Sequence, residues 1–493
     1  MNMLTDEQKP IAEFDGPDRL LVVFAYAGSG KTWTLLEFAK WRPQVKMLYV
    51  SYNRGIRDEA HRRFPKNVEC KTSHQLAWPT FGKMYSHKLA NGNIRLMDIS
   101  RALDLKDWKL VRNSLNTVNN WLASADDCIT EAHAIQCFNE KELEKIRPER
   151  ISVIKKTAEQ IWSLMCDVED ALPMPHDGYL KLYQLSKPVI DSKYKWILYD
   201  EAQDANPPST EIVLSQTCKV IAVGDRHQQI YRFRGAENAL DYFVQAGAKR
   251  FNLTKSFRFG PKVAAVANVV LSFKGETVPV VGMGKEDFLF DEIPAKMMYG
   301  SPMIICRTVM GVLENAIAAA INERTVKFVG GKSAYNLQYL LDVFYLKNDK
   351  LDDIQDKQLK RDFQNWDAYA AIAEETKDSE MNRAIKIVET YADIPETLKT
   401  LESFIVGEEK DVEAYPDFLL TTAHKSKGLE SPDVILHEDF PDVLDPQMPP
   451  ATQEDELNLL YVAVTRAMRN LVLNETVKDL IKSAYEKKKK LAG

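Results

Sequence analysis

The chain has 493 residues, of which 45% are hydrophobic and 28% are charged, with a net charge of −6; this composition excludes intrinsic disorder and indicates roughly two to four globular domains. No apolar run reaches the length of a membrane span, and residues 1–20 are polar and acidic, so we expect no membrane segment, no secretory signal and a cytoplasmic or nuclear location. The six cysteines form no C-x-x-C pair, which argues against a zinc ribbon, an iron–sulfur cluster or a disulfide framework.

In chain order, the first elements predict a parallel α/β sheet. The apolar run at residues 20–24 is followed by a glycine-rich loop and by a helix over residues 32–41. Further short apolar runs, separated by helical patterns, indicate buried strands at residues 47–51, 196–199 and 220–223. The stretch from about Pro79 to Pro188, between the strands at residues 47–51 and 196–199, is mainly helical in pattern and has the composition of an inserted subdomain.

A second α/β rhythm begins near Phe251 and is interrupted by a charged, helix-patterned piece. Its expected strands are residues 303–306, 326–330, 418–422, 434–436 and 471–473. The predicted fold class is therefore α/β, with two parallel-sheet domains that each have an insertion. We place the first domain at residues 1–79 and 189–250, its helical insertion at 80–188, the second domain at 251–345 and 412–493, and its reduced insertion at 346–411.

The loop after the first strand reads FAYAGSGKT. In a phosphate-binding loop, backbone N–H groups and the following helix N-terminus hold phosphate oxygens, so glycines are needed where the backbone comes close. Gly28 and Gly30 meet this need, while Lys31 would reach the β- and γ-phosphates of ATP and Thr32 would bind Mg²⁺. The usual spacing has a glycine where this chain has Ala25, and a chance glycine turn is the alternative interpretation.

A hydrophobic strand ends in two adjacent carboxylates, Asp200 and Glu201, in the sequence DEAQD. Such a pair suits phosphoryl transfer, because one carboxylate can hold hydrated Mg²⁺ while the other orients or deprotonates the attacking water. We assign Asp200 to the metal and Glu201 to the water. A charged loop after a strand is the alternative, and the phosphate loop in the same chain weakens it.

The motif after the next strand reads GDRHQQIYRFRG. The side-chain amide of Gln228 can hydrogen-bond both a γ-phosphate and a water. Tyr231 and Phe233 alternate with Arg232 and Arg234, which is the pattern of a surface that stacks bases and contacts phosphates of a single strand. A strand edge with core aromatics is the alternative.

Taken together and in order, these motifs resemble the UvrD/Rep/PcrA-like DNA helicases of superfamily 1, whose fold is two RecA-like P-loop NTPase domains. In that family A-x-x-G-x-G-K-T is an ordinary loop form, so Ala25 supports the assignment. The resemblance implies that Gln8 reads the adenine. It places SFR on the family motif in which the aromatic, Phe257, packs on adenine and Arg258 meets the γ-phosphate. Arg466, in LYVAVTRA, would be an arginine finger that acts across the domain cleft.

The sequence TAHKSKGLE resembles the family motif that links DNA contact to nucleotide state. The catalytic residues that follow from the motifs are Lys31, Glu201, Gln228, Arg258 and Arg466. The expected ATP contacts are Gln8, Ala27, Gly28, Ser29, Gly30, Lys31, Thr32, Phe257, Arg258, Gly428, Glu430 and Arg466. The expected Mg²⁺ ligands are Thr32 and Asp200. The expected DNA contacts are Tyr52, Asn53, Thr72, His74, Tyr231, Phe233, Arg234 and His424.

A second likeness points to the F-box DNA helicase branch. It rests on the sequences TSHQLA at residues 72–77 and HDGYLKL at residues 176–182. Because the helicase motifs begin at Gln8, we expect no F-box. A loop followed by a packed helix is the alternative interpretation of HDGYLKL.

The resemblance implies a DNA-dependent ATPase that translocates on single-stranded DNA, 3′-to-5′ as in the family, and unwinds duplex DNA in repair, recombination or replication. Its implied partners are single strands and single/double-strand junctions, with a protein partner at the 80–188 insertion, and the motor is expected to be monomeric. Three alternatives stay open: a translocase that mainly removes bound proteins such as recombinase filaments, a DNA-binding scaffold that uses ATP only as a switch, and RNA as the substrate.

Overall fold

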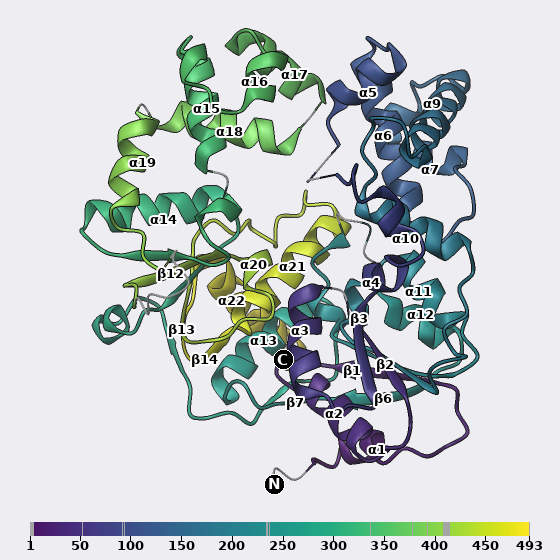
Figure 1. Cartoon of the computed structure of the whole chain (residues 1–493). Helices are drawn as coiled ribbons and strands as arrows, with labels where there is room; N and C mark the ends of the chain where they lie inside the picture. Colours follow the sequence, from purple (N-terminus) through teal and green to yellow (C-terminus); the bar gives the residue numbers. More distant parts are fainter. Residues whose placement is uncertain are drawn as a thin grey trace. The chain divides into compact units, whose positions relative to one another are not determined.

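The computed structural model describes residues 4–51, 53–90, 92, 94–232, 235, 237–335, 337–376, 378–391, 393–407 and 415–492 (Figure 1). The chain divides into two compact units, and each is described by itself. The first comprises residues 1–25 and 30–253, and the second comprises residues 26–29 and 254–493. Among the described residues, no helix is both long enough and apolar enough to cross a membrane.

The first unit is built on a six-stranded parallel sheet with the strand order β3-β2-β4-β5-β1-β6. Its strands are β1 (Leu20–Ala25), β2 (Met47–Ser51), β3 (Val68–Thr72), β4 (Trp196–Tyr199), β5 (Lys219–Gly224) and β6 (Lys249–Leu253). Alternate residues of β1 enter different cores: Leu21 and Val23 share one cluster with Phe38 of helix α2 (Lys31–Lys40), and Val22 belongs to another. Burial on both faces explains why the central strands are continuous apolar runs.

Two strands of this sheet differ from the sequence-based expectation. β3 was not predicted, and it alternates buried with half-buried residues. β6 pairs in parallel with β1, so the segment around Phe251, which we expected to open the second α/β rhythm, is instead an edge strand of the first sheet. Its sequence KRFNL is exposed apart from half-buried Phe251 and buried Leu253, and therefore lacks the apolar signal of a central strand.

Five helices of the described part of the first unit pack near this sheet, and three of them are capped at their N-termini by an asparagine side chain. Asn53 and Asn206 accept from backbone N–H groups at the starts of α3 and α11, and Asn238 does so for α12. These helices are α1 (Lys9–Ala12), α2, α3 (Arg54–Arg63), α11 (Pro207–Leu214) and α12 (Ala239–Gln245).

A helical insertion lies between β3 and β4, as the sequence pattern indicated. Its elements are α4 (Ser73–Ala77), η1 (Gly82–Tyr85), α5 (Leu96–Leu103), α6 (Trp108–Leu122), α7 (Glu131–Ile135), α8 (Glu140–Leu143), α9 (Pro148–Cys166) and α10 (His176–Leu185). Figure 1 shows α5, α6, α7 and α9 grouped beyond the strand ends. Trp121 of α6 packs edge-on against Trp162 of α9, with ring centroids 4.9 Å apart. This contact belongs to a buried apolar cluster that continues from the insertion to one face of the sheet, where it includes Val22 and Leu48.

The second unit contains another six-stranded parallel sheet, in the order β11-β12-β10-β13-β14-β9, which confirms the α/β fold class with two parallel sheets. Its strands are β9 (Phe288–Phe290), β10 (Met303–Cys306), β11 (Val326–Phe328), β12 (Phe418–Thr422), β13 (Ser431–Leu436) and β14 (Ala467–Val472), with a separate two-stranded pair β7 (Lys255–Ser256) and β8 (Val281–Gly282). Its helices outside the insertion are α13 (Pro261–Phe273), α14 (Val309–Ile321), α20 (Ala423–Ser426), α21 (Pro450–Val464) and α22 (Glu475–Ala492).

A second helical insertion separates β11 from β12, and Figure 1 shows it in green. Its elements are η6 (Lys332–Tyr335), α15 (Leu337–Lys347), η7 (Leu351–Asp353), α16 (Lys357–Asp362), α17 (Trp366–Thr376), α18 (Ser379–Thr390) and α19 (Ile394–Glu402). Tyr369 is fully buried, and its hydroxyl lies 2.7 Å from that of Tyr339. The charged segment therefore also has buried aromatic and aliphatic residues, and these continue the apolar cluster of the second sheet.

Candidate functional site

The glycine-rich loop joins β1 to α2, as its sequence predicted. Gly28 and Gly30 have φ angles of +72° and +80°, a left-handed region that side chains rarely adopt. Ala25 is the last residue of β1, is buried, and pairs with Leu253 of β6. It has no positive φ. An alanine in place of the usual glycine is therefore compatible with the loop, because this position is ordinary strand.

Four predicted residues of the first unit come together where β4 and α2 meet. The Lys31 ammonium lies 2.8 Å from the Glu201 carboxylate, and the Thr32 hydroxyl donates to Asp200 Oδ2 at 2.9 Å. Tyr49, which the sequence analysis did not select, donates to the same oxygen at 2.7 Å. The sheet topology explains this convergence, because the ends of neighbouring parallel strands carry their following residues to one edge.

The electrostatics of this cluster suit a phosphate and a divalent cation. Burial raises the pKa of Asp200, and the neighbouring Glu201 carboxylate raises it further. Burial alone lowers the pKa of Lys31, but the carboxylates of Glu201, Asp200 and Asp225 outweigh it, so the pKa is raised and the ammonium stays charged. Two carboxylates beside one ammonium leave excess negative charge. The Thr32 hydroxyl and the Asp200 carboxylate together form an oxygen-only donor set, which fits Mg²⁺.

Gln228 and Gln8 are both buried in the first unit. Gln228 follows β5 and donates to Asp225 Oδ2 at 2.7 Å. Gln8 lies at the start of α1, where its side chain accepts from the Thr5 N–H at 3.2 Å while its own N–H donates to the Thr5 hydroxyl at 3.1 Å. These contacts hold both side-chain amides in defined positions.

The expected DNA contacts of the first unit divide into two groups. Tyr52, Phe233 and Arg234 lie outside the described residues. Among the others, Asn53 and Thr72 are N-caps of α3 and α4, and Thr72 forms a capping box with Gln75. Both side chains thus stabilise the N-termini of their helices by accepting hydrogen bonds from backbone N–H groups.

His74 and Tyr231 are half-buried. His74 Nε2 lies 3.2 Å from Asp177 at the start of α10. The histidine ring also packs edge-on against Tyr179, with centroids 5.8 Å apart. The segments TSHQLA and HDGYLKL, which carried the second likeness, are therefore in direct contact within the first unit.

HDGYLKL forms most of α10, and this helix joins the insertion to the rest of the first unit. Lys181 is fully buried; its ammonium donates to the Ser124 and Asp126 carbonyls at 2.9 and 2.5 Å and lies 4.9 Å from the Trp121 ring. Gln184 donates to the Ala125 carbonyl and to the Glu211 carboxylate of α11. HDGYLKL is thus helical from its first residue, so it is not a loop followed by a helix, and polar contacts hold this helix in addition to packing.

In the second unit, two predicted arginines are bound to their own surroundings. Arg258 pairs with Glu430 at 2.9 Å and donates to the Thr465 carbonyl at 3.0 Å. Arg466 is 1% exposed, and it donates to the carbonyls of Val462 and Leu429 at 2.9 and 3.0 Å. The guanidinium of the expected arginine finger thus lies at the C-terminal end of α21, where the helix dipole favours a cation.

The remaining predicted residues of the second unit have more solvent contact. Phe257 is 48% exposed, which leaves its ring available for stacking. Gly428 has a φ of +85° and open space around it, and His424 of α20 is half-buried.

Residues 26–29 also group with this unit: the Ala27 N–H donates to the Tyr461 hydroxyl at 3.2 Å, and Ser29 Oγ donates to the Tyr26 carbonyl at 2.7 Å.

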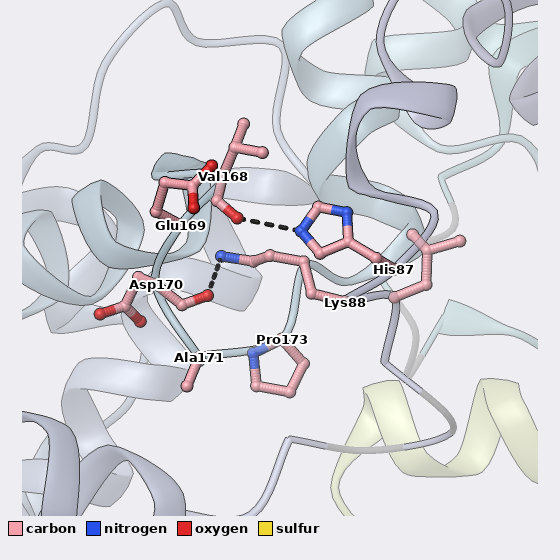
Figure 2. A pocket seen from close by; sticks show the side chains of 8 residues that line it. His87, Lys88, Val168, Glu169, Asp170, Ala171 and Pro173 are labelled. Carbon is pink, nitrogen blue, oxygen red and sulfur yellow. Dashed lines mark hydrogen bonds between the residues drawn. The ribbon is translucent and has the colours of Figure 1, made fainter.

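A pocket of about 520 Å³ lies in the first unit (Figure 2). It is bounded by His87, Lys88 and the loop after α9. The buried Lys88 ammonium donates to three backbone carbonyls near the end of α9, those of Leu164, Asp167 and Asp170. Burial lowers the pKa of Lys88. Lys88 thus satisfies backbone carbonyls at the C-terminal end of α9. None of the predicted site residues lines this pocket.

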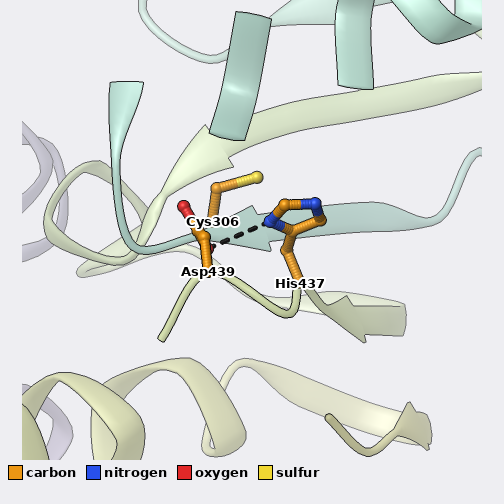
Figure 3. Close-up of side chains that lie close together, drawn as sticks. All are labelled: Cys306, His437 and Asp439. Carbon is orange, nitrogen blue, oxygen red and sulfur yellow. Dashed lines mark ion pairs between the residues drawn. The ribbon is translucent and has the colours of Figure 1, made fainter. Parts of the chain in front are cut away.

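Cys306, His437 and Asp439 lie close together in the second unit (Figure 3). The Asp439 carboxylate accepts from the backbone N–H groups of Arg307 and Thr308 at 2.7 and 2.8 Å, and from the Thr308 hydroxyl at 2.8 Å. Its contact with His437 Nδ1, an ion pair at 3.1 Å, raises the pKa of that imidazole, which favours the protonated form that binds no metal. We interpret the cluster as a structural junction of β10, β13 and α14.

Residues 4–243 match the family model of the UvrD/REP helicase N-terminal domain, and residues 417–474 match that of the UvrD-like helicase C-terminal domain. F-box DNA helicase 1 of Gallus gallus is 35% identical over 98% of this chain and 50% of its own length. F-box DNA helicase protein 1 of Schizosaccharomyces pombe is 31% identical over 97% of this chain and 58% of its own. DNA helicase II of Escherichia coli is 24% identical over 55% of this chain and 40% of its own. The chain thus spans little more than half the length of the first two relatives.

Proposed function

Because the chain belongs to the UvrD/REP helicase family, as its motifs predicted, we propose that it is an ATP-dependent DNA helicase that translocates on single-stranded DNA and unwinds duplex DNA. The observation that supports this best is the cluster of Lys31, Thr32, Asp200 and Glu201, which unites a phosphate-binding cation, two oxygen ligands for Mg²⁺ and a carboxylate for the attacking water. Such a set serves hydrolysis, whereas a scaffold that only binds ATP has no need of the last member.

Within this cluster each residue has a proposed role. Lys31 binds the β- and γ-phosphates, and it exchanges its contact with Glu201 for a contact with phosphate oxygen. That exchange frees Glu201 to orient the water. Thr32 and Asp200 would hold Mg²⁺, whose chemistry here would be to neutralise negative charge on the phosphates.

The arginines of the second unit are proposed to stabilise the charge that develops on the γ-phosphate. Arg258 and Arg466 are bound to Glu430 and to backbone carbonyls in this structure, so their action requires that these contacts be exchanged. An exchange that accompanies ATP binding would make hydrolysis depend on conformation, and repeated cycles would move the protein along the strand. Polarity, 3′-to-5′, is proposed by analogy with the family.

A second candidate function is the removal of proteins from single strands with little unwinding. It is favoured by the second insertion, whose described helices span only Leu337 to Glu402. A small insertion offers little surface for docking a duplex. The larger insertion at residues 80–188 is then the proposed surface for a strand junction or for a protein partner.

One set of assays tests both candidates. Strand displacement on matched duplexes with a 3′ or a 5′ single-stranded tail measures unwinding and polarity together, and clearance of a recombinase filament from a single strand measures protein removal. ATP turnover with and without single-stranded DNA, in wild type and in Glu201→Gln, measures the chemistry. Wild-type turnover that DNA does not stimulate would contradict the proposed function.

A further inference from the structure

Gln203, the fourth residue of DEAQD, has a fully buried side chain that hydrogen-bonds to residues of two motifs. It lies in the 3₁₀ helix η2 (Ala202–Asp204). Its Nε2 donates to Glu201 Oε2 and lies 3.3 Å from Asp204 Oδ2, while its Oε1 accepts from the Asp225 N–H at 3.0 Å. A side-chain amide suits this place because it donates to a carboxylate and accepts from a backbone N–H at the same time.

The hydrogen bonds continue from Asp225 to the side-chain amide of Gln228. Asp225 is 1% exposed; its Oδ1 accepts from the His227 N–H at 3.0 Å and its Oδ2 accepts from Gln228 Nε2 at 2.7 Å. A continuous path therefore runs from Glu201 through Gln203 and Asp225 to Gln228. Because these groups are buried, their hydrogen bonds are stronger than in water and more costly to break.

Two backbone features show that the position of Gln203 is specified. A Cβ on Gly224 would lie 2.3 Å from Gln203 Oε1 and 3.1 Å from the Gln203 backbone nitrogen. The last residue of β5 therefore has no room for a side chain. Glu201 has a φ of +52°, a left-handed conformation that is unfavourable for a residue other than glycine and persists only when its neighbours restrain it. The amide of Gln203 provides such a restraint directly on the Glu201 carboxylate.

We propose that Gln203 is a positioning residue for ATP hydrolysis: it holds the Glu201 carboxylate against the turn that carries Gln228. The residue that orients the water and the amide that meets the γ-phosphate are thereby kept in one arrangement. This inference rests on the proposed roles of Glu201 and Gln228. Gln203 acts through Glu201 and does not itself touch the reacting atoms.

Two substitutions of Gln203 remove its hydrogen bonds in different combinations. Gln203→Met has a similar volume and loses both the donor and the acceptor. Gln203→Glu keeps an oxygen toward the Asp225 N–H but places a carboxylate oxygen against Glu201. We expect both to lower kcat for ATP hydrolysis with saturating single-stranded DNA by about 10- to 100-fold, because a small displacement of a catalytic group has an effect of that order. The KM for ATP and the Kd of a fluorescent ATP analogue should stay within about twofold, since Lys31 and the loop glycines are untouched.

The matched control is Gln184→Glu in the same unit: Gln184 is buried, and the substitution also places a carboxylate beside a glutamate, here the half-buried Glu211. This variant should lower the Tm and leave kcat within about twofold of wild type, because Gln184 serves the joint of the insertion. If it lowered kcat as much as Gln203→Glu does, general destabilisation would explain both results and the proposal would be overturned.

A double-mutant cycle tests whether Gln203 acts through Glu201. Single-turnover hydrolysis should fall in Gln203→Met but fall no further when Gln203→Met is added to Glu201→Gln, since the group being positioned is already lost. A full and independent loss in the double variant would overturn the proposal, as would unchanged kcat in both Gln203 variants. If instead wild type showed no DNA-stimulated turnover, the proposed function itself would fail, which is a distinguishable result.

Discussion

Lys181 offers the sharpest test of how the first insertion is joined to its unit. The side chain is fully buried on α10, and burial lowers the pKa of its ammonium from 10.5 to about 8 despite the nearby carboxylates of Glu211 and Asp126. We therefore expect folding to be opposed by this charge at pH 7, and the opposition to disappear as the group loses its proton in the folded state.

The sign and size follow from proton linkage. Between pH 8 and 10.5 the unfolded chain holds the Lys181 proton that the folded chain has released, so the free energy of unfolding rises with pH over this window. A shift of this size corresponds to about 3 kcal/mol, at about 1.4 kcal/mol for each pKa unit. Below pH 8 the full penalty is present, and above 10.5 it is gone.

The measurement compares wild type with Lys181→Met in urea unfolding at several pH values from 7 to 10.5. Other groups titrate in this range, but they cancel in the difference between the two proteins. We expect the stability of wild type relative to the variant to increase with pH by up to about 3 kcal/mol. A difference that stays flat or decreases would refute the reasoning, because it would mean that the folded state does not disfavour the ammonium.

The remaining predictions concern the catalytic cluster and the insertion core. Glu201→Gln should lower DNA-stimulated ATP hydrolysis by about 10²- to 10⁴-fold and retain binding of a fluorescent ATP analogue, and loss of binding would contradict its assignment to the water. Tyr49→Phe removes the hydroxyl that donates to Asp200 at 2.7 Å, so the Mg²⁺ concentration for half-maximal turnover should rise about tenfold, and an unchanged Mg²⁺ titration would count against that role. Trp121→Ala removes a ring that is 2% exposed and should lower the free energy of unfolding by about 3–5 kcal/mol, whereas Trp41→Ala, at a 57% exposed ring, should stay within about 0.5 kcal/mol of wild type in the same urea titration.

The order of the motifs along the sequence was enough to predict the family and the fold class. Short apolar runs such as LLVVF identify central strands because these are buried on both faces. The loop, DEAQD and the glutamine motif then follow the strands of one sheet, so their convergence was predictable from topology. Ala25 was compatible with this prediction because it belongs to β1 rather than to the turn.

Tertiary structure decided what local pattern does not encode. The polar edge strand β6 joins the first sheet through pairing with β1, although its residues carry almost no apolar signal. Tyr49 contacts Asp200 because β2 and β4 pair side by side, and nothing near Tyr49 in the sequence distinguishes it from a packed core residue. Gln203 lies within DEAQD, but its contact with Asp225 depends on the strand β5 that precedes Asp225. Arg466, which was expected to reach for a phosphate, is buried against carbonyls of its own unit. The sequence thus determined which chemical groups the protein has and which strand ends they follow. The hydrogen bonds that orient those groups depend largely on residues far apart in the chain, because only the folded backbone brings their polar atoms within about 3 Å of one another.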